Sequence, residues 1–363
     1  MNFKIITLFI VTVFLNCKTV TPKKFESNNE NFQYSGRHEQ LKGEAALISP
    51  GASVAINFSG QTCKIYLKAE KEPYNYVSLE LDGSYIGRLK ISSEITKEYT
   101  VNVTSKEKTH SLKIIKESEA SCGAILFQSI KVENVLEKSK KQKYTIEFIG
   151  DSITCGAAAD SSVFPCNEGG YFDHENAYYS YGACTARALN ADFTLSSVSG
   201  IGMYRNWNDE NIEEPIMPQV YENLYLDTNT SKKNNFTHAP EIITIALGTN
   251  DLSTGDGTKP RLPFNKEIYI SNYIQFIKTI QNYYSNSRIV LLTSPMVIGE
   301  NNTLLVSCLE EVQSYFLKNF NKSILLFQFN KQYTNGCSWH PSVEEHKEMA
   351  KKLTSFLKNI LNS

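Results

Sequence analysis

The spacing of hydrophobic and polar residues changes character along this chain. From Tyr34 to about Leu136, short runs alternate with a period of two, as expected for strands with one buried face. Turn-forming pairs such as Asp82-Gly83 separate the runs. This spacing predicts an antiparallel β-sandwich, of the jelly-roll type, over residues 34–137. The runs are SVAINF, CKIYLKAE, YVSLELDG, GRLKIS, EYTVNVT, HSLKIIKES and GAILFQSIKVE.

A second rhythm follows residues 137–143, EKSKKQK, which we interpret as a charged hinge between two domains. Beyond it, apolar runs typical of buried strands alternate with longer segments that have helical spacing. This alternation predicts a parallel sheet covered on both faces, an α/β/α domain over residues 144–361. The strand runs are YTIEFIG, DFTLSSVSG, EIITIALG, RIVLLTSP and SILLFQFN. The helical segments are residues 175–191, 264–285, 302–320 and 341–361.

The first 17 residues have the pattern of an export signal. Lys4 is followed by a short apolar run, IITLFIVTVFLN, that ends at Cys17. The run is too short to span a membrane comfortably, so we expect a signal peptide over residues 1–17. It also resembles a bacterial lipoprotein signal, which predicts a secreted, periplasmic or cell-surface protein with a lipid on Cys17. Residues 18–33 are predicted to be a tether, while sequons such as Asn57-Phe58-Ser59 keep a eukaryotic secreted source open.

Charge and cysteine spacing narrow the function classes. The formal net charge is -1, without the basic footprint of a nucleic-acid-binding protein, so no nucleic acid partner is expected. No C-x-x-C pair occurs, and we predict neither a metal site nor a cofactor. Of eight cysteines, seven lie beyond Cys17. Export permits disulfides, and Cys308 with Cys337 is the pair that we expect to form one.

Polar residues follow several of the predicted parallel strands, where ligands of such sheets bind. Ser152 ends the run IEFIGDS, and it is either an exposed nucleophile or a helix N-cap. Gly200 and Asn250 follow two other strands; each offers an N–H donor, although Asn250 also fits an ordinary turn. His340 precedes the last helix and is a candidate base, whereas His346 fits a structural or surface role.

Together these features resemble the SGNH (GDSL-like) hydrolase superfamily, on the segments IEFIGDSITCG, SVSGIGMYRN, ITIALGTND and WHPS. With the sandwich in front, the chain resembles carbohydrate esterase family 2, acetyl esterases of plant polysaccharides. The resemblance implies a flavodoxin-like fold, with Ser152 as nucleophile and His340 as base. It implies an oxyanion hole made by the N–H groups of Ser152 and Gly200 and the side chain of Asn250. It also implies that Tyr204 presents an aromatic ring to the sugar.

One departure from the superfamily pattern concerns the partner of His340. Superfamily members usually place an aspartate shortly before the histidine, but residues 336–339 are Gly, Cys, Ser and Trp. Members of family 2 work with a Ser–His dyad, so we predict that the carbonyl of Cys337 or Ser338 orients the ring. Asp151 is not assigned to the catalytic group. Trp339, beside the histidine, is expected to contact substrate.

These observations predict an O-acetyl esterase whose partner is an acetylated polysaccharide or oligosaccharide, such as xylan or glucomannan. Two alternatives stay open. The first is an SGNH lipase or thioesterase acting on other acyl groups. The second is a surface carbohydrate-binding protein without activity, which the missing aspartate favours and the set Ser152, Asn250 and His340 opposes.

Overall fold

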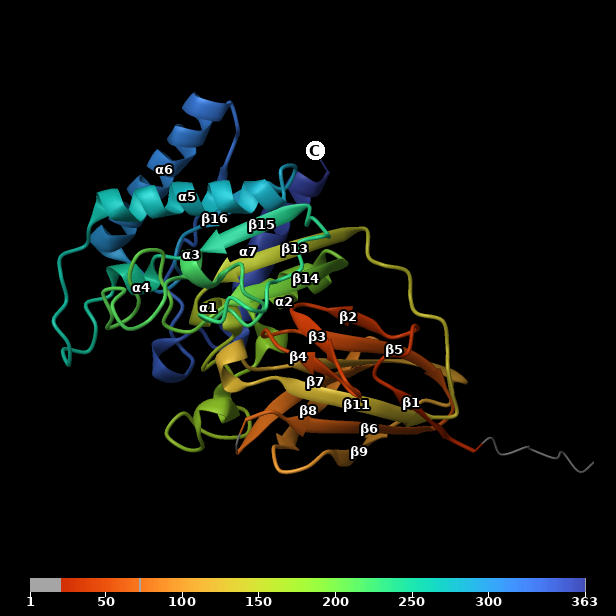
Figure 1. Ribbon diagram of the computed structural model, residues 1–363. Helices are drawn as coiled ribbons and strands as arrows, with labels where there is room; N and C mark the ends of the chain where they lie inside the picture. Colours follow the sequence, from red (N-terminus) through yellow and green to blue (C-terminus); the bar gives the residue numbers. More distant parts are fainter. Residues whose placement is uncertain (1–20, 72, 363) are drawn as a thin grey trace, which may run out of the picture.

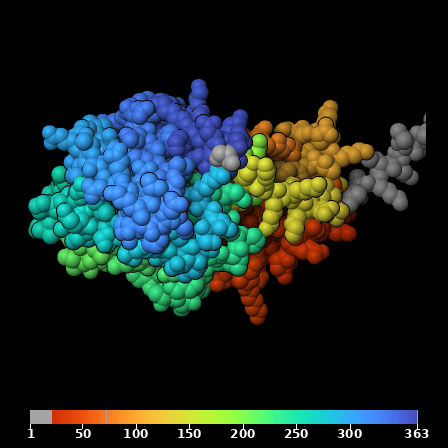
Figure 2. All heavy atoms as spheres, turned by 90° about the horizontal axis from the view of Figure 1, so that it is seen from above, coloured from red at the N-terminus to blue at the C-terminus, as the bar shows by residue number. Residues whose placement is uncertain are grey.

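The computed structural model describes residues 21–71 and 73–362, which form two packed domains (Figure 1). In Figure 1 the N-terminal domain, red to yellow, lies below the C-terminal domain, green to blue. Viewed from above, the two lie side by side (Figure 2). The expected signal, residues 1–17, lies outside the described residues.

The N-terminal domain is the expected antiparallel β-sandwich. In β6, the residues Cys63, Ile65, Leu67 and Ala69 are buried and alternate with more exposed neighbours, so its period of two matches one buried face. The first sheet contains β1 (Lys23–Glu26), β3 (His38–Leu41), β4 (Glu44–Leu47), β6 (Thr62–Ala69), β9 (Lys97–Asn102) and β11 (Ile125–Val132). The second contains β2 (Gln33–Ser35), β5 (Ser53–Ser59), β7 (Tyr74–Leu81), β8 (Ser84–Ser92), β10 (Thr109–Lys116) and β12 (Asn134–Val135).

The segment expected to be a tether, residues 18–33, is part of the sandwich from Lys23 onward. Strand β1 pairs antiparallel with β11, and the N–H of Ser27 continues the pairing to the carbonyl of Gln128 at 2.8 Å. Phe32 is buried against Phe127, with ring centroids 5.8 Å apart. The expectation was wrong there because single phenylalanines and backbone pairing anchor a segment whose composition is polar.

The C-terminal domain is the expected three-layer α/β/α sandwich. Its parallel strands lie in the order β14-β13-β15-β16-β17, the flavodoxin-like order. On β13, Phe148 packs on the side of α2 and α7, and Ile149 on the side of α5 and α6. The strands are β13 (Tyr144–Gly150), β14 (Ala191–Ser197), β15 (Ile242–Ala246), β16 (Arg288–Leu292) and β17 (Leu325–Phe327). The helices are α2 (Tyr181–Ala188), α5 (Lys266–Tyr283), α6 (Gly299–Phe320) and α7 (Val343–Leu361).

Three strands of this sheet lead into the structures that will form the site. β13 runs into the short helix α1 (Ser152–Cys155), and β15 runs into α4 (Thr249–Leu252). β14 runs into the turn at residues 198–202. Because the strands are parallel, these three connections meet at one edge of the sheet. The remaining short helix, α3 (Met217–Val220), lies in the connection from β14 to β15.

A buried arginine of the sandwich joins the two domains. The guanidinium of Arg37 donates to the carbonyls of Asn223 at 2.7 Å and Tyr221 at 2.9 Å, both in the C-terminal domain. It also donates to the hydroxyl of Ser196 on β14, which in turn donates to Glu147 at 2.6 Å. Arg37 and Glu147 are both buried, and a buried charge is stable only when paired and hydrogen-bonded. The two domains are therefore locked by specific polar contacts.

Candidate functional site

Ser152 stands at the end of the central strand. The cap of α1 is Asp151, whose Oδ1 accepts the N–H of Ile153 at 3.0 Å, so Ser152 is the first helical residue and not the cap. A Cβ atom at Gly150 would lie 2.1 Å from Oγ1 of Thr154, so only glycine fits this turn. The hydroxyl of Ser152 is thus free to face the cavity described below. Its N–H has no acceptor within the helix, as is usual for a first turn.

His340 lies against this serine. Its Nε2 is 2.8 Å from Oγ of Ser152, and its Nδ1 is 2.9 Å from the carbonyl oxygen of Ser338. A carbonyl only accepts hydrogen bonds, so Nδ1 carries the proton and Nε2 is free to accept one from the serine. Of the two carbonyls expected to orient the ring, it is that of Ser338. Within residues 21–71 and 73–362, no carboxylate forms a hydrogen bond with His340.

The loop that carries His340 has an unusual backbone. Ser338 and Trp339 both adopt left-handed conformations, with φ of 50° and 62°. Each such non-glycine residue costs about 1–2 kcal/mol, so other contacts must hold the loop. The N–H of Gly336 donates to the carbonyl of His340 at 2.7 Å, and the N–H of His340 donates to that of Cys337 at 3.0 Å. This tight turn leaves Trp339 78% exposed.

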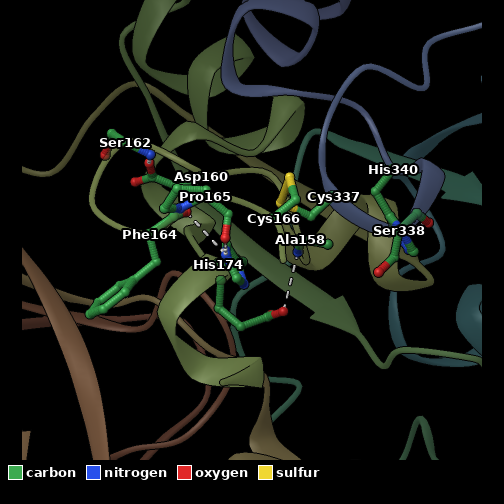
Figure 3. The surroundings of a disulfide bond; sticks show 11 residues. Ala158, Asp160, Ser162, Phe164, Pro165, Cys166, His174, Cys337, Ser338 and His340 are labelled. Atoms are coloured by element: carbon green, nitrogen blue, oxygen red, sulfur yellow. Dashed lines mark hydrogen bonds between the residues drawn. A yellow bond between two sulfur atoms is a disulfide. The ribbon is translucent and has the colours of Figure 1, made fainter. Parts of the chain in front are cut away.

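A disulfide fixes the same loop to a distant segment. Cys337 is bonded to Cys166, 171 positions earlier, and its N–H donates to the carbonyl of Ala158 at 2.8 Å. Figure 3 shows this bond with Ser338 and His340 beside Cys337. The expected bridge between Cys308 and Cys337 is therefore wrong. Cys308 is a free thiol on the buried face of α6, packed in the core.

The turn at residues 198–202 leaves one backbone donor unused. Gly200, with φ of +75°, is the only residue of this turn whose N–H has no acceptor among the described residues. The others are bonded: Val198 to the carbonyl of Gly150, Ser199 to Glu119, Ile201 to the carbonyl of Val198, and Gly202 to Asn206. Because Gly200 lines the cavity described next, the free N–H is available to a bound anion.

An open cavity of about 1080 Å³ brings these groups together. Its lining includes Ser152, Gly200, Asn250 and His340, four of the residues expected at the site. Asn250 donates one amide N–H to the carbonyl of Ile201 at 2.8 Å, which leaves the second for the cavity. Trp207 and Trp339, the two tryptophans of the chain, also line it. The cavity thus combines polar groups at one point with aromatic walls.

Tyr204 does not line this cavity, so the expectation that it faces a sugar there was wrong. The carboxylate of Asp251 accepts the N–H of Tyr204 at 2.8 Å, which turns the side chain inward. Its buried hydroxyl accepts the N–H of Asn265 at 3.0 Å, and its ring packs on Phe264. Trp207, three residues further and 46% exposed, takes the place at the cavity. Tryptophan occurs only twice in the chain, and this rarity was the sequence signal that could have pointed to Trp207.

Burial sets the protonation of the groups near Ser152. It lowers the pKa of His340 below 6.5, and the carbonyls of Ser338 and Cys337 only partly oppose it. Burial raises the pKa of Asp151 to about 6. His346 is fully buried with a pKa lowered to about 3, and its Nδ1 accepts the N–H of Tyr181 at 3.1 Å. His346 is therefore a structural, neutral histidine.

No group of three or more His, Cys, Asp or Glu side chains is placed to hold a metal ion in residues 21–71 and 73–362. A helix able to span a membrane is likewise absent from the described residues.

Comparison with known protein families agrees with this architecture. Residues 34–138 match the model described as Carbohydrate esterase 2 N-terminal, and residues 148–316 match the GDSL-like Lipase/Acylhydrolase family. The fold and the matched models thus define a protein of the GDSL-like class that carries a β-sandwich domain. The chain belongs to carbohydrate esterase family 2.

Individual relatives are similar over most of this chain. Cellulase/esterase CelE of Acetivibrio thermocellus is 29% identical over 351 residues, 93% of this chain and 40% of that protein. An acetylxylan esterase / glucomannan deacetylase of Cellvibrio japonicus is 28% identical over 221 residues, 60% of this chain. This chain therefore spans 40% and 59% of the lengths of these relatives.

Solved structures are similar over nearly the whole chain. A family two carbohydrate esterase from Clostridium thermocellum, in complex with cellohexaose, has a TM-score of 0.81 at 27% identity. The match covers 91% of this chain and 99% of that one. A family two carbohydrate esterase from Cellvibrio japonicus shares the fold, with a TM-score of 0.82 at 23% identity, over 94% of this chain and 98% of that one.

We predict that the disulfide stabilises the loop of His340. Replacing Cys166 with serine should lower the free energy of unfolding by about 2–5 kcal/mol, because the loop loses a crosslink. The C308S variant is the control, since that thiol forms no bridge. Urea unfolding with and without a reductant measures both variants. A wild type that reductant destabilises no more than C166S would contradict the assignment.

Proposed function

We propose that this protein is a carbohydrate O-acetyl esterase that uses Ser152 as nucleophile and His340 as base. The observation that carries the proposal is the 2.8 Å contact between Oγ of Ser152 and Nε2 of His340, in the tautomer able to accept the proton. The free N–H of Gly200 beside the same cavity supports it. A nucleophile, a base held by a third group and an anion site are the parts that acyl transfer needs.

In the first half of the reaction, Oγ of Ser152 attacks the acetyl carbonyl while Nε2 of His340 takes the hydroxyl proton. The carbonyl oxygen becomes an oxyanion. The N–H groups of Ser152 and Gly200 and the amide of Asn250 stabilise it, an effect worth on the order of 100- to 1000-fold in rate per donor. The bond to the sugar oxygen then breaks, and the sugar leaves as an alcohol with the proton returned by His340.

In the second half, a water molecule takes the place of the sugar. His340 removes one proton from it, and the resulting hydroxide attacks the acetyl group on Ser152. A second oxyanion forms and collapses, so that acetate leaves and the serine regains its proton from His340. The free enzyme is then restored.

The shape of the cavity favours sugars as the alcohol part. Its rim exposes Trp207, Trp339 and Tyr171, flat aromatic side chains that have an apolar body and a polar tip or edge. The cavity is open and places polar groups beside its aromatic rings, an arrangement that suits a small acyl group on a polar sugar chain. The names of two relatives point to acetylated xylan and glucomannan as substrates.

We also propose export, with a lipid attached to Cys17. The sequence pattern of residues 1–17 supports export, and the bond between Cys166 and Cys337 fits an oxidising compartment. In a bacterial host, the wild type should enter the detergent phase of a phase separation and carry labelled palmitate. The C17A variant should do neither. Equal partitioning of the two variants would argue against lipid attachment.

Loss of the nucleophile should abolish acetate release. We expect the wild type to release acetate from acetylated xylan or glucomannan, and S152A to be at least about 1000-fold slower, because the covalent route is gone. S161A is the matched control, since Ser161 is exposed and outside the cavity lining. Faster hydrolysis of p-nitrophenyl octanoate than of the acetate would favour a lipase. Glycan binding without hydrolysis by the wild type would favour a binding protein.

The pH profile should report His340. A histidine accepts a proton only while neutral, and burial lowers its pKa. Activity should therefore persist below pH 6.5 and fall as the pH drops through this lowered value. Asp151, with a pKa of about 6, titrates in the same region, so D151N serves as the control. The limb should persist in D151N. An acid limb centred above pH 6.5, or one that disappears in D151N, would contradict the assignment of His340.

A further inference from the structure

A carboxylate of the sandwich domain reaches the edge of the cavity. Glu119 lies just after β10 and is buried. Its Oε2 accepts the N–H of Ser199 at 2.6 Å, and its Oε1 accepts the hydroxyl proton of Tyr171 at 2.7 Å. Both partners belong to the C-terminal domain. Ser199 is the residue directly before Gly200, so Glu119 holds the turn that carries the free N–H.

The turn is held at its side chain as well as at its backbone. The hydroxyl of Tyr171 lies 3.0 Å from Oγ of Ser199, so Glu119, Tyr171 and Ser199 form a closed set of contacts. Hydrogen bonds to an ionised carboxylate are about twice as strong as neutral ones. The peptide plane before Ser199 is therefore fixed, and only the two backbone dihedrals of Ser199, whose side chain is also held, separate it from the plane that carries the N–H of Gly200.

Glu119 is itself held rigidly within the sandwich. The buried ammonium of Lys116 donates to the backbone carbonyl of Glu119 at 2.7 Å and to that of Ser118 at 2.5 Å. Burial lowers the pKa of Lys116 to about 8, which leaves it mostly charged at neutral pH. A fixed backbone limits the positions that the carboxylate can take. The side chain thus transmits the position of the sandwich to the turn.

We infer that Glu119 is a positioning residue for the proposed reaction, which orients the N–H of Gly200 toward the oxyanion. The inference rests on the proposed function. It makes the sandwich domain part of the catalytic apparatus, because the acid that aligns a donor of the hydrolase domain comes from the other domain. Misplacing a reacting or stabilising group by about 1 Å can cost on the order of 100-fold in rate.

Glu39 offers a matched control. It is also a carboxylate of the sandwich, and it accepts hydrogen bonds from Tyr225 at 3.2 Å and Lys232 at 2.7 Å, both in the C-terminal domain. None of these three residues lines the cavity. Variants of Glu39 therefore remove a contact between the same two domains without touching the turn of Gly200.

The test compares E119A, E119D and E119Q with E39A, E39D and E39Q. Each is measured for kcat and KM on p-nitrophenyl acetate, for the inhibition constant of a trifluoromethyl ketone, and for thermal unfolding. The ketone forms a tetrahedral adduct with the serine and so reports oxyanion binding. For E119A we expect kcat to fall about 10- to 100-fold with KM within about twofold, and inhibition to weaken in parallel.

The conservative variants separate reach from charge. E119D keeps the charge but withdraws the carboxylate by one methylene, so kcat should fall nearly as far as in E119A. E119Q keeps the length and an acceptor for the N–H of Ser199, so its kcat should lie closer to the wild type. The three variants of Glu39 should keep the kcat and the inhibition constant of the wild type.

Several outcomes would overturn the inference. One is a kcat in the Glu119 variants that falls no further than in the Glu39 variants; another is a loss confined to KM. Failure of all three Glu119 variants to fold, beside folded Glu39 variants, would make Glu119 a purely structural residue. A wild type without esterase activity would overturn the proposed function and this inference with it, whereas an active wild type limits the failure to Glu119.

Discussion

The hydrogen bond from Nδ1 of His340 to the carbonyl of Ser338 decides which ring nitrogen contacts Ser152. A carbonyl oxygen only accepts hydrogen bonds, so the proton stays on Nδ1. Nε2 is then unprotonated and can accept the proton of the serine hydroxyl. Burial lowers the pKa of His340, and the hydrogen-bonded carbonyl opposes this only in part. The left-handed conformations of Ser338 and Trp339 accompany this contact between the carbonyl and the ring.

The need to hold the ring of His340 in this orientation explains why distant segments converge on the site. The His340 loop is bonded to Cys166, and the segment around Cys166 is held in turn by the sandwich. Tyr74 and Tyr76 of β7 donate to the carboxylate of Asp173 at 2.8 and 2.6 Å. Arg88 of β8 adds a contact to the carbonyl of Asp173 at 2.8 Å. Contacts with the N-terminal domain thus hold both the loop of His340 and the turn of Gly200. The first is held through Asp173 and the second through Glu119.

The periodic features of the chain were predictable from the sequence. Strands such as β6 and β13 are set by local alternation or by an apolar run. The parallel order of β14, β13 and β15 places Ser152, Gly200 and Asn250 at one edge of their sheet. Polar residues at the ends of buried strands are conspicuous because the preceding residues are apolar. His340 could be predicted for a related reason, since it precedes a long amphipathic helix that begins at Val343.

Features that depend on long-range proximity were not predictable. The partner of Cys337 is 171 residues away, and nothing local to Cys166 distinguishes it from Cys308. The inward turn of Tyr204 depends on Asp251, which belongs to another connection. The contact between Glu119 and Ser199 was not predicted, because Glu119 lies in the sandwich domain, where the sequence shows no motif of the site. Strand β1 was missed because its pairing with β11 is made by the backbone, which composition does not reveal.

Covalent labelling tests the proposed roles of Ser152 and His340 most directly. Diethyl p-nitrophenyl phosphate, followed by intact-mass and peptide mass spectrometry, reports which serine is activated by a base and an oxyanion site. We expect a single diethylphosphoryl group on Ser152, with labelling much slower once His340 is replaced by alanine. An unlabelled protein, or a label on another residue such as Ser199, would contradict these roles.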